Sequence, residues 1–172
     1  NIIDFFGKPL IAWTIESAIR SDLFDDVIVS TDSDEIGNIS KSFGAKVFKR
    51  VEFADDITPV SEATINTVTN LNYSHRDIIY QLMPNCPLRT EHDILSATEY
   101  FDGLETFDSL ISCFKFGWMN PWWALKKTDG KYSSLFEISM NIRSQDLDEL
   151  FCPTGSIWIS TLDSLLKQNS YY

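Results

Sequence analysis

The chain has 172 residues, a net charge of −11 and three cysteines. A chain of this length can bury a sizeable core as one domain, and its acidity excludes a nucleic-acid backbone as the main partner, because phosphates require a basic face. No apolar run approaches the roughly 20 residues that a membrane span needs, so we expect no membrane partner. The cysteines are far apart and lack metal spacing, which indicates reduced thiols in a cytoplasmic protein; they are Cys86, Cys113 and Cys152.

The first half of the chain predicts helices that alternate with strands. A helical stripe begins at Ile11, and a short apolar run at Val27–Val29 is typical of a buried parallel strand. Asp32 and Glu35 offer a capping box for a second helix, which Gly44 would end. A strand at 46–49, a helix at about 61–70, a strand at 78–82 and a helix at 90–101 follow.

This alternation predicts an α/β fold with a mostly parallel, doubly wound sheet that is covered on both faces. Ligands of such sheets bind at the carboxyl ends of the strands. The loops most relevant to function are therefore residues 30–33, 50–61 and 83–90.

The pattern changes after residue 108. A strand at 110–114 leads into an aromatic-rich stretch at 118–123, and Thr128–Lys131 predicts a turn between two strands. A late strand at 155–159 and a helix close the sequence. We predict one domain over residues 1–172 with a β-rich excursion at about 117–150.

Four segments occur in an order that carries a family resemblance. They are Asn1–Ile3 with Phe6–Ile11, Val27–Asp32 with Gly44-Ala45, Pro84–Thr90, and Arg143–Leu147 with Gly155–Ile159. Together they resemble the acylneuraminate cytidylyltransferase family. The resemblance implies a Rossmann-like nucleotidyltransferase that transfers CMP from CTP to a nonulosonic, sialic-type sugar acid and releases pyrophosphate.

The sequence also departs from the family pattern. The family's Gly-rich, triphosphate-binding segment would end at Asn1 and its late acidic metal-binding segment would follow Tyr172, so we expect residues beyond both ends. Met83 stands where the family often has Gln, and Ser144 and Asp148 replace a family Arg and Pro. These replacements are also compatible with an unusual sugar acid as substrate.

Five residues are candidates for binding the nucleotide. The resemblance alone suggests Asn1. Arg50 opens a loop after a strand, where its guanidinium can bind a phosphate or a base edge, or can simply be solvated. Ser61 precedes a helix, where it can bind an anion or cap the helix. Pro84 fixes the backbone at the end of a strand, and Asn85 offers both a donor and an acceptor.

Three further residues are candidates for binding the sugar acid. The planar fork of Arg143 matches the two oxygens of a carboxylate, although Asp146 is an alternative, structural partner for it. Gln145 suits the sugar hydroxyls, and Gly155 belongs to a motif of the resemblance. We assign no catalytic residue.

The implied reaction needs a divalent cation, usually Mg²⁺, on the phosphates. Asp32 and Asp34 are spaced like a metal pair, but helix capping explains them without a metal, and we assign no metal ligand. The aromatic residues of the excursion favour packing or a subunit interface over stacking on a sugar or a base, so we expect a homodimer.

Two other classes of function stay open at this point. The first is a non-catalytic module that binds a sugar nucleotide. The second is a glycosyltransferase, for which Asp32-Ser33-Asp34 supplies a formal Asp-x-Asp motif. A third alternative keeps the nucleotidyltransferase chemistry but uses another sugar acid.

Overall fold

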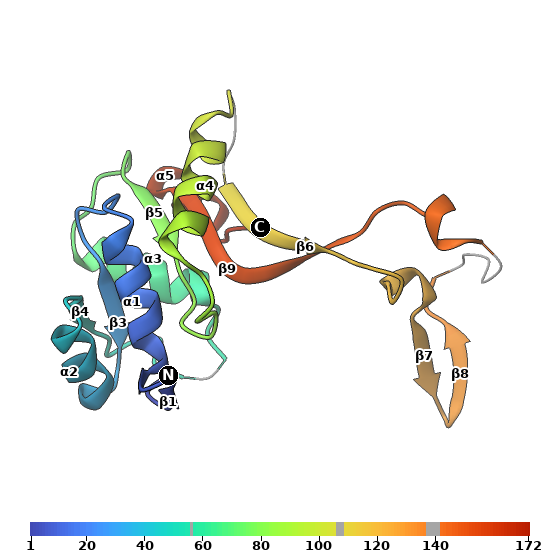
Figure 1. Cartoon of the computed structure of the whole chain (residues 1–172), viewed down its shortest axis with the longest axis horizontal. Coiled ribbons are helices and arrows are strands. Elements are labelled where there is room, and N and C mark those ends of the chain that lie inside the picture. Colours follow the sequence, from blue (N-terminus) through green and yellow to red (C-terminus); the bar gives the residue numbers. More distant parts are fainter. Residues whose placement is uncertain (56, 106–108, 137–141) are drawn as a thin grey trace. The chain divides into compact units, whose positions relative to one another are not determined.

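The computed structural model describes residues 1–55, 57–105, 109–136 and 142–172, except for the side chain of Ser144. The described residues form two compact units (Figure 1). The first unit comprises residues 1–112 and 155–172, and the second comprises residues 113–154.

The first unit begins with a short hairpin of β1 (Asp4–Phe5) and β2 (Lys8–Pro9). Helices and strands then alternate as the sequence predicts. They are α1 (Leu10–Arg20), β3 (Ile28–Thr31), α2 (Asp34–Ser42), β4 (Lys46–Lys49), α3 (Val60–Asn70), β5 (Ile78–Gln81) and α4 (Glu91–Asp102). The strands β6 (Ser109–Lys115) and β9 (Phe151–Thr161) contribute residues to both units, and α5 (Leu162–Gln168) follows in the first.

The strand pairing is less parallel than predicted. Strands β3 and β4 are parallel, with Ile28 opposite Lys46. Strand β9, however, lies between β5 and β6 and runs antiparallel to β5, with Ile78 opposite Thr161 (Figure 1). The α/β class is confirmed, whereas the mostly parallel sheet is wrong for β5 and β9, because the chain returns from residues 113–154 in the opposite direction.

Both faces of the strands are covered, as the sequence predicts. On β9, Ile157 and Ile159 pack with Ile94 and Phe101 of α4, whereas the intervening Trp158 belongs to a separate cluster. That second cluster includes apolar residues of α3 and α5, namely Val60, Ile65 and Leu165. The period of two along the strand therefore separates two cores, one on each face.

Local capping sets the ends of the helices, with one difference from the prediction. Ser33, rather than Asp32, is the N-cap of α2, since its Oγ accepts the N–H of Ile36 at 3.3 Å. Thr90 is the N-cap of α4 and forms a reciprocal capping box with Asp93. No helix formed by the described residues is both long enough and apolar enough to cross a membrane.

The second unit contains the hairpin of β7 (Leu125–Thr128) and β8 (Lys131–Ser134). Asp129 and Gly130, which join the strands, both have positive φ, as a tight hairpin turn requires. A 3-10 turn at Pro121–Trp123 precedes the hairpin, and the Nε1 of Trp122 donates to the Asp148 carbonyl at 2.9 Å. The predicted turn at Thr128–Lys131 is thus confirmed.

Candidate functional site

Residues at the carboxyl ends of β3 and β5 accept hydrogen bonds from neighbouring segments. The N–H of Arg50, which follows β4, donates to the carbonyl of Thr31 at the end of β3 at 2.9 Å. The hydroxyl of Thr64, one turn into α3, donates to Oε1 of Gln81 at the end of β5 at 2.5 Å. These bonds place Arg50 beside the carboxyl end of β3 and the start of α3 beside that of β5, and ligands of α/β folds bind at the carboxyl ends of the strands.

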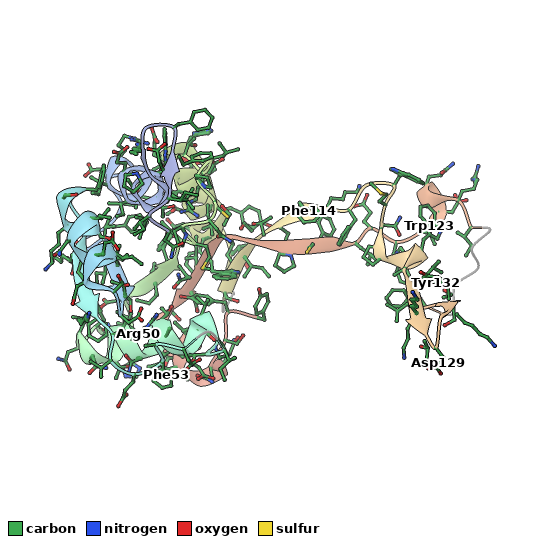
Figure 2. All side chains as sticks on the ribbon, turned by 90° about the horizontal axis from the view of Figure 1, so that it is seen from below. Arg50, Phe53, Phe114, Trp123, Asp129 and Tyr132 are labelled. Carbon is green, nitrogen blue, oxygen red and sulfur yellow. The ribbon has the colours of Figure 1, made fainter. Side chains whose placement is uncertain are left out.

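The side chain of Arg50 is partly buried at this edge (Figure 2). Its Nε is inaccessible to solvent and has no hydrogen-bond partner among the described residues. The alternative of a fully solvated surface arginine is therefore not what the structure shows. A buried N–H without an acceptor is costly, so this guanidinium is suited to an anionic or polar ligand.

The helix α3 begins after Pro59 without a side-chain cap. Ser61 lies in its first turn and does not cap it, so the capping alternative for this residue is wrong. Thr58 is held by Asp55 instead, with its hydroxyl 2.9 Å from Oδ2. The backbone N–H groups of Ile57 and Thr58, together with that hydroxyl, hold the pKa of Asp55 below its usual value. The uncapped first turn of α3 is free to present N–H groups to a phosphate.

The loop after β5 contains two tight turns. The N–H of Cys86 donates to the Met83 carbonyl at 3.4 Å, and the N–H of Arg89 donates to the Cys86 carbonyl at 3.2 Å. Pro84 is partly buried, while Asn85 is exposed at the turn. The predicted rigid loop is present, and it leaves the amide of Asn85 accessible.

Gly155 lies against this loop. Its φ is +69°, and a Cβ built on it would lie 3.8 Å from Cγ of Met83 and 3.7 Å from Cη2 of Trp158. Met83 and Trp158 also share an apolar cluster with Val60, which directly precedes Ser61. Ser61 and Pro84 therefore directly follow members of this apolar cluster in the sequence, and Gly155 lies beside two of its members in space.

The backbone of Asn1 is hydrogen-bonded to helix α1. Its carbonyl accepts the N–H of Ile11 at 2.9 Å, and the carbonyl of Ile3 accepts the N–H of Leu10 at the same distance. The residue itself is exposed. Because these bonds attach it to the first turn of α1, its position relative to that helix is set.

Arg89 is a buried residue of this region that the sequence analysis did not identify. It is 5% exposed, and its guanidinium donates to the carbonyls of Met83 and Ser156 and to the hydroxyl of Thr14. Burial lowers its pKa. These partners are mostly backbone groups, which leave no signature in the sequence.

Arg143 and Gln145 belong to the second unit. Arg143 forms a two-point ion pair with Asp146, with Nε 2.8 Å from Oδ2 and Nη2 3.1 Å from Oδ1. Gln145 lies within the short 3-10 turn Ser144–Asp146. The structural alternative for Arg143 is thus realised here, and its contact with a sugar carboxylate stays a prediction.

The described residues do not form a dedicated metal site. No group of three or more His, Cys, Asp or Glu side chains gathers within the described ranges. Asp34 lies in the first turn of α2, and its Oδ1 accepts from Nζ of Lys49 at 2.6 Å, which holds its pKa below the usual value. Asp34 is thus paired with Lys49, and Asp32 directly precedes the N-cap residue of α2.

Comparison with known proteins decides the family. Residues 1–115 match a family model described as "Cytidylyltransferase". The chain belongs to the cytidylyltransferase family. This match covers α1–α4 and the candidate nucleotide residues Asn1, Arg50, Ser61, Pro84 and Asn85.

Curated relatives narrow the family to enzymes named for sugar acids, which confirms the predicted resemblance. The chain is 31% identical over 161 residues to a Helicobacter pylori protein named as a pseudaminic acid cytidylyltransferase and a hydrolase, aligning 92% of this chain with 31% of that protein. It is 27% identical to an Escherichia coli N-acylneuraminate cytidylyltransferase, and the alignment covers 100% of this chain and 41% of that protein. It is 28% identical to a Campylobacter jejuni pseudaminic acid cytidylyltransferase, with 98% and 74% covered. This cytidylyltransferase-family chain thus spans less than half the length of the first two relatives.

Solved structures confirm the fold. One match is the structure of CMP-2-keto-3-deoxy-manno-octonic acid synthetase complexed with CTP, at a TM-score of 0.71 and 16% sequence identity. The match covers 98% of this chain and 69% of that chain. The chain also matches a cytidylyltransferase from Leptospira borgpetersenii with a TM-score of 0.61, 18% identity, and 98% and 56% covered. At these identities the likeness establishes the α/β nucleotidyltransferase fold.

Proposed function

We propose that the full-length protein transfers CMP from CTP to a nonulosonic sugar acid and releases pyrophosphate. The observation that carries the proposal is the family match over residues 1–115, which includes all five candidate nucleotide residues. Relatives named for pseudaminic and N-acylneuraminic acids support a sugar acid of this class as the acceptor.

The site supplies groups suited to a nucleotide. The partly buried guanidinium of Arg50 can bind a phosphate or the base edge through parallel hydrogen bonds. The uncapped first turn of α3, which includes Ser61, presents N–H groups where negative charge is favoured. The exposed amide of Asn85 can donate to and accept from a base or a sugar.

On this proposal, the anomeric hydroxyl of the sugar acid attacks the α-phosphorus of CTP and pyrophosphate leaves. Such a displacement depends on in-line positioning and on positive charge near the phosphates. A divalent cation, usually Mg²⁺, would supply part of that charge when bound with the triphosphate, since Mg²⁺ commonly binds one or two carboxylates and substrate phosphates. We assign no step to it, because the described residues do not form a cluster of metal ligands.

We further propose that the protein is cytoplasmic and homodimeric, with the second unit reaching the partner subunit. Exposed apolar side chains in that unit support an interface: Trp118 is 74% exposed and Met119 is 77% exposed. The sugar-acid residues Arg143, Gln145 and Gly155 remain proposals for the acceptor. For Arg143, contact with a sugar carboxylate requires that the Asp146 pair opens.

The test is a pyrophosphate-release assay on the full-length protein with Mg²⁺ and a panel of sugar acids. We expect release with CTP and a nonulosonic acid, and little with UTP or ATP. Robust turnover with UTP or ATP and none with CTP would contradict the proposal. Binding of CTP without turnover for any sugar acid would favour a non-catalytic module instead.

A further inference from the structure

The guanidinium of Arg89 is buried and is hydrogen-bonded to carbonyl and hydroxyl oxygens. Its Nη1 donates to the carbonyls of Met83, at 3.4 Å, and of Ser156, and its Nη2 donates to Oγ1 of Thr14 at 2.9 Å and again to Met83 at 3.4 Å. Arg89 forms no ion pair with an acidic side chain among the described residues. The positive charge is therefore balanced by the dipoles of two carbonyls and one hydroxyl, which bind Nη1 and Nη2. The Nε of Arg89 is also inaccessible to solvent and has no hydrogen-bond partner among the described residues.

These partners come from three separate segments. Thr14 lies on α1, Met83 begins the loop after β5, and Ser156 lies on β9 next to Gly155. The backbone of Arg89 is fixed as well, since the hydroxyl of Ser17 on α1 donates to its carbonyl at 2.9 Å. One side chain thus ties the two ends of its own loop together and attaches that loop to the strand beside it.

The loop and the strand lie next to each other in the candidate site. Asn85 is exposed in the loop, and Gly155 abuts Met83 at the other side. A charge buried without a carboxylate is costly, and an apolar side chain of similar volume would fill the same space at lower cost. A guanidinium, however, can hold several carbonyl groups in one fixed arrangement, because its donors form a rigid planar fork.

We propose that Arg89 is a positioning residue of the transfer reaction, which holds the Pro84–Leu88 turn against Gly155 and Ser156 without contacting the substrate. This inference rests on the function proposed above for the same site. A displacement of about 1 Å at a reacting centre can cost about 100-fold in rate. Loss of the fork should therefore affect turnover more than the affinity for CTP.

The test compares Arg89→Met, Arg89→Lys and the control Phe101→Ala in the full-length protein, well below each unfolding temperature. Phe101 is 1% exposed at the C-terminal end of α4 and packs against Ile157 and Ile159 of β9, so its replacement lowers stability through a cavity in the core and leaves the bonds of Arg89 in place. We expect kcat to fall about 10- to 100-fold in Arg89→Met, with a smaller rise in KM for CTP. Arg89→Lys should recover part of kcat, and folded Phe101→Ala should keep it.

Hydrogen exchange supplies a second measurement that does not depend on activity. In Arg89→Met the backbone amides at positions 86 and 89 should exchange faster, while that of Gly37 in α2 is unchanged. If the wild type releases no pyrophosphate with CTP, the proposed function fails, and exchange still tests the positioning role. If Arg89→Met does not fold, Arg89→Lys carries both measurements. Wild-type kcat and wild-type loop exchange in a folded variant, or an equal loss of kcat in Phe101→Ala, would overturn the inference.

Discussion

Replacing Arg50 by Met should weaken CTP binding while leaving the fold intact. The backbone bond from Arg50 to Thr31 survives the substitution, because it involves only the N–H group. The side chain loses a charged donor whose Nε has no partner among the described residues. Removal of a partly buried, unpaired charge in favour of a methylene chain is neutral or stabilising for the fold.

The expected loss follows from one charge-assisted hydrogen bond to the nucleotide. Such a bond is worth about 1.5–3 kcal/mol, which corresponds to an increase of about 10- to 150-fold in Kd. Isothermal titration calorimetry with CTP, in the absence of sugar acid, measures the change directly. Arg76→Met is the matched control, since it removes the same charge from an exposed residue between α3 and β5.

Two results would refute this reasoning. Unchanged affinity for CTP in a folded Arg50→Met variant would remove Arg50 from the site. An equal loss of affinity in Arg76→Met would show that the effect reflects overall charge rather than a contact at the end of β4.

Two further predictions concern the hydroxyl of Tyr73 and the second unit. Partial burial and a hydrogen bond to Asp26 raise the pKa of Tyr73 to about 12, so the neutral phenol stabilises the fold below pH 10 and this contribution is lost as the pH rises from 10 towards 12. In urea titrations at pH 9 and 11, Tyr73→Phe should therefore lose less stability than the wild type, and an equal loss would contradict the assignment. The full-length protein should sediment as a dimer at micromolar concentration, and Trp118→Ser combined with Met119→Ser should shift it towards monomer. Ile57→Ser, at a 90% exposed position of the first unit, is the control, and a monomeric wild type would refute the interface.

The helices and most strands could be predicted because each depends on a pattern of residues that lie close together in the sequence. The capping box of Thr90 and Asp93 depends on side chains three residues apart, and both residues can be seen in the sequence. The choice of Ser33 over Asp32 as the cap of α2 was missed, because both side chains are chemically capable and the backbone conformation decides between them.

Non-local features were harder to predict. The antiparallel pairing of β9 with β5 joins Ile78 to Thr161, and no periodicity within either strand specifies its partner. The partners of Arg89 could not be predicted because its main acceptors are backbone carbonyls, which every residue carries. The ion pair of Arg143 with Asp146, by contrast, could be anticipated from a spacing of three residues.

The position of β9 also determines the order in which this protein can fold during synthesis. A nascent chain that has emerged as far as residue 150 already contains α1–α4, β5 and β6, but not the strand that lies between β5 and β6. Until β9 is translated, those two strands expose unpaired edges, which are templates for aggregation. Closure of the sheet then requires contacts between residues about 80 positions apart in the sequence, from Ile78 to Thr161. Contacts between residues so far apart in the sequence slow folding. We therefore expect completion of the first unit to occur late in translation, after the whole of residues 113–154 has been made.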